Sequence, residues 1–438
     1  MIYDYAKIKL HSRMNEKQIE KYQLKKARKI VRYAVKKSSF FRKYYEGYDL
    51  KDVWNLPITN KKMLMENLTE WNTVGLTKEE ILDFCLDVER TRDFSRRLKG
   101  LAVGMSSGTS GNKGVEIATR REENFLRTYV LAKFPRPKGK INMAFILRVS
   151  SPAFNIDRFG HKLTYISQLN PLDVLREKLE NLKPNVVAAP PSMLRILARE
   201  YARGRLNIRP EMLVSYAEVL SKDTKKYLEE SFHCKVYEIY KATEAGIAMS
   251  CKYGTLHIAE DLVAVELLDE DGNPVPPGMP AHKMIITNLV KTALPIIRYE
   301  LNDVIMLSGE KCRCGSSFRV IESVQGRSDD IFWAPTLDGK GYQFIFPDYI
   351  RRGIITCSDC IEEYQVIQEK PLKITVKILI SNEEDFDNIS ECIKRNIRAV
   401  FAEYGCEKPS VKVIKGKPKY AASGKLIRIM RGFKLEDI

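Results

Sequence analysis

The sequence contains no run of uncharged apolar residues that approaches the ~18 to 20 needed to cross a bilayer. Its first residues, MIYDYAKIKLHSRM, carry charges where a secretory signal peptide has its apolar stretch. Its 9 cysteines are odd in number and spread over 438 residues, so without an export signal we expect no disulfide framework. These absences predict a cytoplasmic protein without membrane insertion, whose clustered cysteines are metal ligands or reduced core residues.

Internal repeats and low-complexity tracts are also missing, and the composition is that of a folded protein. Hydrophobic residues make up 44% and charged residues 29% of a chain long enough for more than one core. The net charge of +17 is partly local, because residues 1–50 contain 14 Lys and Arg against 5 Asp and Glu. Apolar residues at helical spacing, among them Ala27 and Val31, predict an amphipathic helix here with a basic outer face. That face is open to three interpretations: a solvated surface, a nucleic-acid site, or attraction of a polyphosphate cofactor or acidic partner.

Three segments of different pattern follow one another along the chain. From about residue 100, short apolar runs such as INMAFIL alternate with amphipathic segments such as PLDVLREKLENL, which predicts an α/β domain with buried, largely parallel strands. Residues 255–308 have the pattern of antiparallel strands joined by DGN and PPG turns. Beyond residue 327, two strand-like runs and a helix ending at Gly405 indicate a separate α+β domain. We therefore predict a large N-terminal α/β domain, 1–326, with an antiparallel portion, and a small C-terminal α+β domain, 327–438.

A Ser- and Gly-rich segment between Met105 and Gly114 is the most informative motif. Small hydroxyl residues and glycines let a backbone wrap around a phosphate with N–H and O–H donors pointing inward, and Lys113 adds a positive charge. The order GxxxxGK[ST] is absent, so this is not a Walker loop. The predicted phosphate ligands are Ser106, Ser107, Gly108, Thr109, Ser110, Gly111 and Lys113.

The segment SSGTSGNKG resembles the phosphate loop of the adenylate-forming enzymes, which include acyl-CoA synthetases, peptide-synthetase adenylation domains and luciferases. Four further motifs resemble those of the same family and come in the family's order: Tyr240–Glu244, Arg298–Asp303, Gly326–Asp330 and Ser423–Arg428. The whole chain is most similar to the phenylacetate-CoA ligase branch and its CapK-like relatives. YKATEAG, SYAEVL and RYELNDV look most like a poorly characterised subgroup, so the branch does not settle the substrate.

The resemblance implies an adenylate-forming fold with a mobile C-terminal domain, and a role for individual residues. Attack of a carboxylate on the α-phosphate of ATP needs neutralised charge on the phosphorus and on the departing pyrophosphate. Glu244 is the candidate Mg²⁺ ligand, with Thr243 beside it on the phosphate, and Lys425 is the candidate cation at the attacked phosphorus. Asp303 offers two acceptor oxygens to the ribose hydroxyls, and Arg327 offers donors to the ribose or the phosphates.

Two more positions of these motifs have expected roles, and one departs from the family. Tyr240 is expected either to stack on adenine or to pack as a structural residue. Asp329 lies in the motif that resembles the hinge between the domains. The glycine that usually follows the loop tyrosine is replaced by Lys241, whose side chain is expected near the adenine or the acyl pocket. After the hinge, DDIFWAPTL replaces the usual apolar-lysine-glycine continuation.

A second constellation has the composition of a metal site. Two cysteines separated by one residue, Cys312 and Cys314, follow Cys251 and His257 in the chain. Thiolates and an imidazole suit tetrahedral zinc, and the glycine after Cys314 permits a tight turn that points both sulfurs at one ion. We predict a closed Cys3His structural zinc site, an arrangement that phenylacetate-CoA ligase relatives also resemble, against the alternative of reduced core cysteines. The pair Cys357 and Cys360 is a weaker rival, because no further ligand is near it in sequence.

Together these patterns predict an enzyme that uses ATP and Mg²⁺ to convert a carboxylic acid to an acyl-adenylate, with release of pyrophosphate. We expect transfer to the thiol of CoA, with an acyl carrier protein or an amine as the alternative acceptor. A basic nucleic-acid-binding zinc protein is the non-enzyme alternative, and nucleic acid is the less favoured partner. Whether the protein forms a homodimer is left open.

Overall fold

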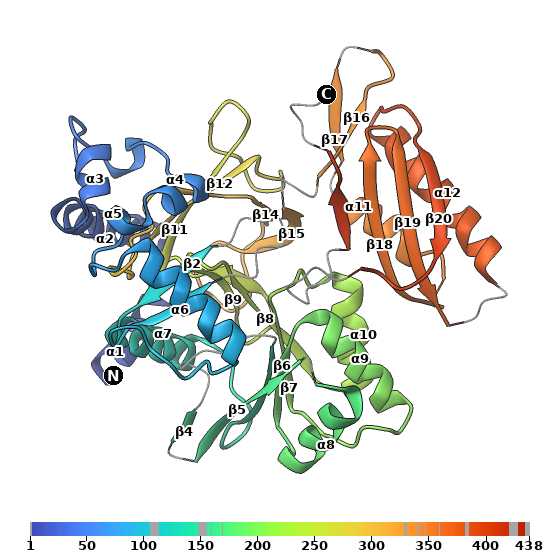
Figure 1. Ribbon diagram of the computed structural model, residues 1–438, viewed down its shortest axis with the longest axis horizontal. Coiled ribbons are helices and arrows are strands. Elements are labelled where there is room, and N and C mark those ends of the chain that lie inside the picture. The colour runs from blue at the N-terminus through green and yellow to red at the C-terminus, as the bar shows by residue number, and fades with distance from the viewer. Residues whose placement is uncertain are drawn as a thin grey trace. The chain divides into compact units, whose positions relative to one another are not determined.

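The computed structural model describes residues 2–105, 114–147, 156–158, 160–168, 170–327, 331–339, 341–345, 347–358, 360–381, 385–419 and 428–433. These residues divide into two compact units (Figure 1). Unit 1 comprises the described residues up to 301 together with 306–323, and unit 2 comprises 302–305 and the described residues from 324 onward.

Unit 1 begins with a group of helices. They are α1 (Ile2–His11), α2 (Glu16–Lys37), α3 (Ser39–Tyr44), the short 3₁₀ helix η1 (Val53–Asn55), α4 (Lys61–Glu66), α5 (Leu68–Trp71) and α6 (Lys78–Thr91). A capping box between Asn15 and Gln18 starts α2 by satisfying free backbone N–H groups. Ala27 and Val31 of α2 are buried while most of its lysines are exposed, which confirms the predicted amphipathic helix.

An eight-stranded sheet forms the centre of unit 1, with strand order β10-β9-β8-β7-β6-β3-β5-β4. Its strands are β3 (Asn142–Leu147), β4 (Ile156–Arg158), β5 (His161–Ser167), β6 (Val186–Ala189), β7 (Met212–Tyr216), β8 (Lys235–Lys241), β9 (Gly246–Ser250) and β10 (Leu256–Ile258). Strands β5, β3, β6, β7 and β8 run parallel, and the outer strands β4, β9 and β10 join in antiparallel fashion. The predicted α/β pattern is thus confirmed.

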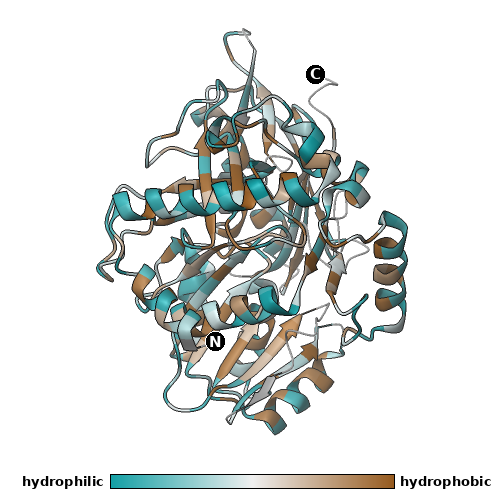
Figure 2. Ribbon diagram, turned by 90° about the vertical axis from the view of Figure 1, so that its left-hand side faces the viewer, coloured by the Kyte–Doolittle hydropathy of each residue, from teal (hydrophilic) through white to brown (hydrophobic). Residues whose placement is uncertain are grey.

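Three helices cover one face of this sheet: α8 (Leu172–Leu182), α9 (Pro191–Ala202) and α10 (Lys222–Phe232). Leucines such as Leu179, Leu197 and Leu228 pack there against Ile146 and Leu213 of the strands. Removing these apolar surfaces from water is the main stabilising contribution to such a core. In Figure 2 hydrophobic residues dominate the strands, while both kinds of residue alternate along the helices.

Smaller sheets complete unit 1. The hairpin of β1 (Ala102–Met105) and β2 (Val115–Ala118) leads into α7 (Arg120–Lys133), and β11 (Val263–Leu268), β12 (Lys283–Asn288) and β13 (Tyr299–Leu301) form an antiparallel sheet. Thr59 bridges to Tyr299, so a segment from the N-terminal helices extends this sheet. The sheet of β11, β12 and β13 confirms the predicted antiparallel portion. The paired strands β14 (Asp303–Leu307) and β15 (Ile321–Arg327) follow, and each has residues in both units.

Unit 2 contains a hairpin, a four-stranded sheet and two helices. The hairpin pairs β16 (Phe332–Pro335) with β17 (Tyr342–Ile345), and the sheet order is β20 (Ser410–Lys415), β19 (Lys373–Ile380), β18 (Ile361–Lys370) and β21 (Ile429–Arg431). Helices α11 (Pro347–Ile355) and α12 (Phe386–Glu403) bury apolar residues such as Ile354, Ile393 and Ile397 with the strands. The chain after α12 turns at Gly405, whose φ of +69° is a conformation that glycine adopts at little cost.

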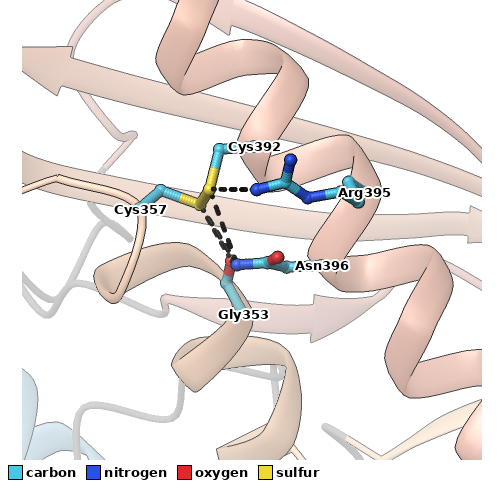
Figure 3. The surroundings of a disulfide bond; sticks show 5 residues. All are labelled: Gly353, Cys357, Cys392, Arg395 and Asn396. Carbon is cyan, nitrogen blue, oxygen red and sulfur yellow. Dashed lines mark hydrogen bonds between the residues drawn. A yellow bond between two sulfur atoms is a disulfide. The ribbon is translucent and has the colours of Figure 1, made fainter.

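A disulfide in unit 2 corrects the expectation that the cysteines are reduced. Cys357, just after α11, is bonded to Cys392 of α12, and their Cα atoms lie 5.7 Å apart, within the usual disulfide range. Asn396 donates to Cys357 Sγ at 3.3 Å and to Gly353 O at 3.1 Å (Figure 3). Cys360, the predicted partner of Cys357 in a rival metal pair, is a free cysteine. The pairing depends on the packing of α11 against α12, which the spacing of cysteines along the chain does not reveal.

No helix in the described part of the chain combines the length and apolar character needed to span a membrane.

Candidate active site

The predicted phosphate loop lies outside the described residues from Ser106 to Lys113, but the strands on either side of it are placed. In the β1–β2 hairpin, Met105 and Val115 are directly paired. The two arms of the predicted loop therefore start from adjacent positions. Glu116 stands at the beginning of the downstream arm, two residues after Gly114.

The turn between β8 and β9 holds Thr243 and Glu244. Glu244 is 8% exposed, and its Oε1 accepts a hydrogen bond from Tyr299 Oη at 3.1 Å. Burial, and the neighbouring charge of Glu244, raise the pKa of Tyr299 well above its usual value, so Tyr299 is the donor. The carbonyl of Glu244 accepts a hydrogen bond from Asn288 Nδ2 at 3.3 Å. At the end of β8, Tyr240 Oη lies 3.9 Å from Met284 Sδ.

Two lysines share the carboxylate of Glu116. Lys291 Nζ lies 2.8 Å from Glu116 Oε1 and 3.4 Å from the carbonyl oxygen of Thr243, while Lys241 Nζ lies 2.7 Å from Glu116 Oε2. Burial alone would raise the pKa of Glu116, but the charges of Lys241 and Lys291 outweigh it and lower that pKa to about 2. Lys241, whose side chain was expected beside adenine or the acyl group, thus forms an ion pair with Glu116 of β2.

In the motif from Arg298 to Asp303, the arginine is a buried structural residue and the aspartate is half-buried. The guanidinium of Arg298 is buried against Glu266, with Nε and Nη2 at 3.1 and 2.9 Å from its two carboxylate oxygens. Its Nη1 also donates to Leu56 O at 2.6 Å. Burial raises the pKa of Glu266, and Arg298 opposes this rise. Asp303 is half-buried at the first position of β14.

The structure brings together only part of the predicted site. Tyr240, Thr243 and Glu244 lie on one strand end and its turn. Arg327 ends β15 with only its backbone described, and Asp329 and Lys425 lie outside the described residues. Sequence reasoning did not single out Glu116, Asn288 or Lys291, whose contacts join segments as far as 175 residues apart.

All four predicted metal ligands lie together in unit 1. The ligand atoms of Cys251, His257, Cys312 and Cys314 are all within 4.8 Å of one another. Cys251 follows β9 and His257 lies in β10, while the other two cysteines lie in the loop between β14 and β15. The carbonyl of Arg319 accepts from the N–H of Ile258, which binds this loop to β10.

The separations within this cluster fit a tetrahedral metal. With Zn–S bonds of about 2.3 Å, two sulfurs on a tetrahedral zinc lie about 3.8 Å apart, and Cys251 Sγ and Cys312 Sγ are separated by 3.8 Å. Cys314 Sγ lies 3.5 Å from His257 Nε2. His257 Nδ1 contacts the carbonyl oxygen of Phe318 at 2.8 Å, and donation from Nδ1 to this acceptor leaves Nε2 as the ligand atom.

Comparison with known proteins places this geometry in a family. Residues 101–285, which include the β1–β2 hairpin and the β8–β9 turn, match the family of AMP-binding enzymes. The chain belongs to the adenylate-forming superfamily. This confirms the resemblance found in the sequence.

Distant relatives of this adenylate-forming chain include phenylacetate-coenzyme A ligases and protein CapK. The ligase of Thermus thermophilus is 27% identical over 201 residues, 43% of this chain and 43% of that protein. The ligase of Escherichia coli is 23% identical over 73% of this chain and 70% of that protein. Protein CapK of Staphylococcus aureus is 21% identical over 78% of this chain and 70% of that protein. The chain thus spans less than half the length of the Thermus ligase.

Solved structures show the same fold. 2-Hydroxyisobutyryl-CoA ligase in its postadenylation state has a TM-score of 0.72 at 16% identity, covering 97% of this chain and 91% of that one. An amide bond synthetase from Marinactinospora thermotolerans has a TM-score of 0.53 at 12% identity, covering 78% of this chain and 69% of that one. The adenylate-forming α/β fold with a large N-terminal and a small C-terminal sheet is therefore confirmed.

Proposed function

We propose that this protein activates a carboxylic acid with ATP to an acyl-adenylate, releases pyrophosphate, and transfers the acyl group to the thiol of CoA. The observation that carries the proposal is the Thr243–Glu244 turn, in which the buried Glu244 is oriented by Tyr299. The Glu244 carboxylate would be suited to hold a Mg²⁺ ion, which would supply positive charge to the departing pyrophosphate. Membership of the AMP-binding family supports the nucleotide, and the names of the phenylacetate-CoA ligase relatives support CoA.

The remaining roles follow from the motifs. The proposed phosphate contacts are Ser106, Ser107, Gly108, Thr109, Ser110, Gly111 and Lys113. Tyr240 is proposed to lie against adenine, Asp303 to accept from the ribose hydroxyls, and Arg327 to donate to ribose or phosphate. Residues 1–326 would then bind ATP and the acid, and residues 327–438 would move about Asp329 to bring Lys425 to the reaction.

Pyrophosphate release tests the first half-reaction. The assay uses ATP, Mg²⁺ and a panel of aryl, aliphatic and amino acids, each with and without CoA. We expect one chemical class to stimulate release, and mass spectrometry to detect its acyl-CoA when CoA is present. Complete absence of acid-dependent release would refute the adenylation proposal.

The same assay distinguishes the acceptors. Free CoA should saturate the second step at micromolar to millimolar concentration. An enzyme specific for a carrier protein or an amine would instead accumulate acyl-adenylate at every CoA concentration. The amide bond synthetase among the structures of this fold is the observation that favours the amine as second candidate.

A direct test of Lys425 separates the two half-reactions. Replacing Lys425 by Ala should lower adenylate formation by roughly 10²-fold or more, the scale of losing one preorganised charge at a transition state. Thioester formation from a supplied acyl-adenylate should fall far less. Equal loss of both steps would contradict the assigned role.

The Cys3His cluster is proposed to hold one structural zinc ion. Four protein ligands leave no open coordination position, which is typical of structural zinc and not of catalytic zinc. Bound zinc would join the β9–β10 hairpin to the loop between β14 and β15. Elemental analysis of protein purified without chelator should find one zinc per chain, and absence of stoichiometric metal would remove the site.

A further inference from the structure

One short segment contacts both parts of the proposed nucleotide site. It comprises residues 288–299, from the last residue of β12 to the first residue of β13, and we refer to it as the bracket segment. It is part of unit 1, as are the β1–β2 hairpin and the β8–β9 turn. Its central residues, 289–297, lie outside the motifs of the sequence.

The first set of contacts holds the Thr243–Glu244 turn. Asn288 donates to the carbonyl of Glu244, and Lys291 Nζ lies 3.4 Å from the carbonyl oxygen of Thr243. The side chain of Asn288 also accepts from the backbone N–H of Lys291 at 3.0 Å, which holds the Asn288 side chain against the backbone of Lys291. From the other end of the segment, Tyr299 donates to the Glu244 carboxylate. Backbone and side chain of the turn are therefore both bound to the bracket segment.

The second set of contacts holds the downstream arm of the predicted phosphate loop. Lys291 Nζ lies 2.8 Å from Glu116 of β2. Six residues later Glu122, in the first turn of α7, accepts from the N–H groups of Thr292 and Ala293. A capping box with Thr119 fixes Glu122 itself. The arm is thus attached to the bracket segment at two points.

Lys291 is the side chain that belongs to both sets. The residue is 3% exposed, and its ammonium binds a carboxylate that follows the loop and a carbonyl of the turn. A buried ammonium needs such partners because losing water around a charge is costly. Lys241 differs, because its side chain is about half exposed and its ammonium pairs with Glu116.

We propose that Lys291 is a positioning residue for adenylation, setting the distance between β2, which follows the predicted phosphate loop in the chain, and the Thr243–Glu244 turn. This inference rests on the proposed function. Phosphates bound by the loop and Mg²⁺ bound by Glu244 must meet in one geometry, and small displacements of such groups reduce rates strongly. Lys291 would act through Glu116 and Thr243 without touching ATP.

The experiment compares Lys291→Met with Lys291→Arg and Lys291→Gln in the full-length protein. Each is assayed by pyrophosphate release with the acid that supports wild-type turnover, varying ATP, Mg²⁺ and acid in turn. We expect Lys291→Met to lower kcat/KM for ATP at least tenfold and to raise the Mg²⁺ concentration needed for half-maximal rate. The KM for the acid should change less than twofold. Lys291→Arg, which keeps a cation and several donors, should recover most of the loss.

Three comparisons keep the result interpretable. Lys62→Met, on the exposed face of α4, should match wild type. Lys241→Gly, which leaves both contacts of Lys291 in place, should lose less than Lys291→Met. If Lys291→Met does not fold, judged by its thermal transition, Lys291→Gln decides, because its side chain is polar enough for the buried position but is one bond shorter and uncharged, so it cannot join Glu116 to Thr243 as the ammonium does.

The outcomes separate this inference from the function on which it rests. An inactive wild type across the acid panel overturns the proposed function and this inference with it. An active wild type accompanied by a folded Lys291→Met or Lys291→Gln whose ATP and Mg²⁺ dependence is unchanged overturns only the positioning role. Equal rises in KM for ATP and for the acid would also overturn it, because they indicate general loosening of the unit.

Discussion

Removing the Cys357–Cys392 disulfide should destabilise unit 2 without affecting unit 1. The bond closes a loop with a sequence separation of 35 residues. The chain-entropy relation for a loop of this length gives a stabilisation of about 4 kcal/mol, through restriction of the unfolded chain. Cys392→Ser keeps the size of the side chain and leaves the Asn396–Gly353 contact between α12 and α11 in place. The loss should therefore come mainly from the missing cross-link.

Hydrogen exchange followed by mass spectrometry measures this loss in the full-length chain. Protein prepared without reductant should first show seven titratable thiols after denaturation, as expected for the seven free cysteines. The most protected amides of α12 should then exchange on the order of 10² to 10³ times faster in Cys392→Ser than in wild type, the equivalent of about 3 to 4 kcal/mol. Peptides from β6 and β7 in unit 1 should be unchanged.

Cys360→Ser is the matched control, because it makes the same replacement at a half-buried free cysteine of the same unit. It should leave the protection of α12 close to that of wild type. The reasoning is refuted if both variants show equal protection, or if the denatured wild-type protein shows nine titratable thiols.

Three further predictions concern unit 1. Glu116→Gln should lose about 3 kcal/mol of stability near neutral pH, because the native pKa of about 2 lies below the ordinary 4.5. Because the pKa of Glu116 is lowered in the folded protein, its ionised carboxylate stabilises the fold above pH 4.5, and this contribution is lost as the pH falls toward 2. The difference in the free energy of unfolding between wild type and variant, measured in urea, should therefore become smaller from pH 6 to pH 3. A difference that stays constant over this range would contradict the assignment. Tyr299→Phe removes one hydrogen bond to a carboxylate, a contribution of about 1.5 to 3 kcal/mol, and should raise the Mg²⁺ requirement of pyrophosphate release at nearly unchanged KM for the acid. Cys312→Ser should reduce the zinc content and the thermal stability of unit 1 together, since structural zinc contributes folding free energy; full zinc occupancy in this variant would argue against Cys312 as a ligand.

Much of the fold could be predicted because its signals are local. The runs around β3, β6, β7 and β8 are apolar and short, and the intervening helices have one apolar face, so periodicity alone indicated a parallel α/β sheet. The helix that precedes Gly405 was equally clear, since glycine commonly ends a helix by adopting positive φ. The metal cluster was predictable because its residue types are rare and chemically specific, although its two halves lie about 55 residues apart.

Contacts set by tertiary packing could not be predicted in this way. The disulfide joins Cys357 to Cys392 because α11 packs on α12, whereas the sequence drew attention to the nearer Cys360. Arg298 looked like part of a nucleotide motif, yet its guanidinium is buried against Glu266 and holds Leu56. The identity of a charged residue in a motif does not show whether its side chain faces a ligand or a buried partner.

The departure at Lys241 shows how a residue unusual for the family is accommodated. With glycine at position 241, Glu116 would pair with Lys291 alone. With Lys241 present but without Glu116, the ammonium groups of Lys241 and Lys291 would lie close together with no carboxylate between them. The Glu116 carboxylate prevents this conflict by using one oxygen for each ammonium. The two lysines and Glu116 together leave one net positive charge at β2, next in the chain to the predicted phosphate loop. Glu116 therefore makes Lys241 compatible with the buried Lys291, whose ammonium lies 3.4 Å from the Thr243 carbonyl oxygen.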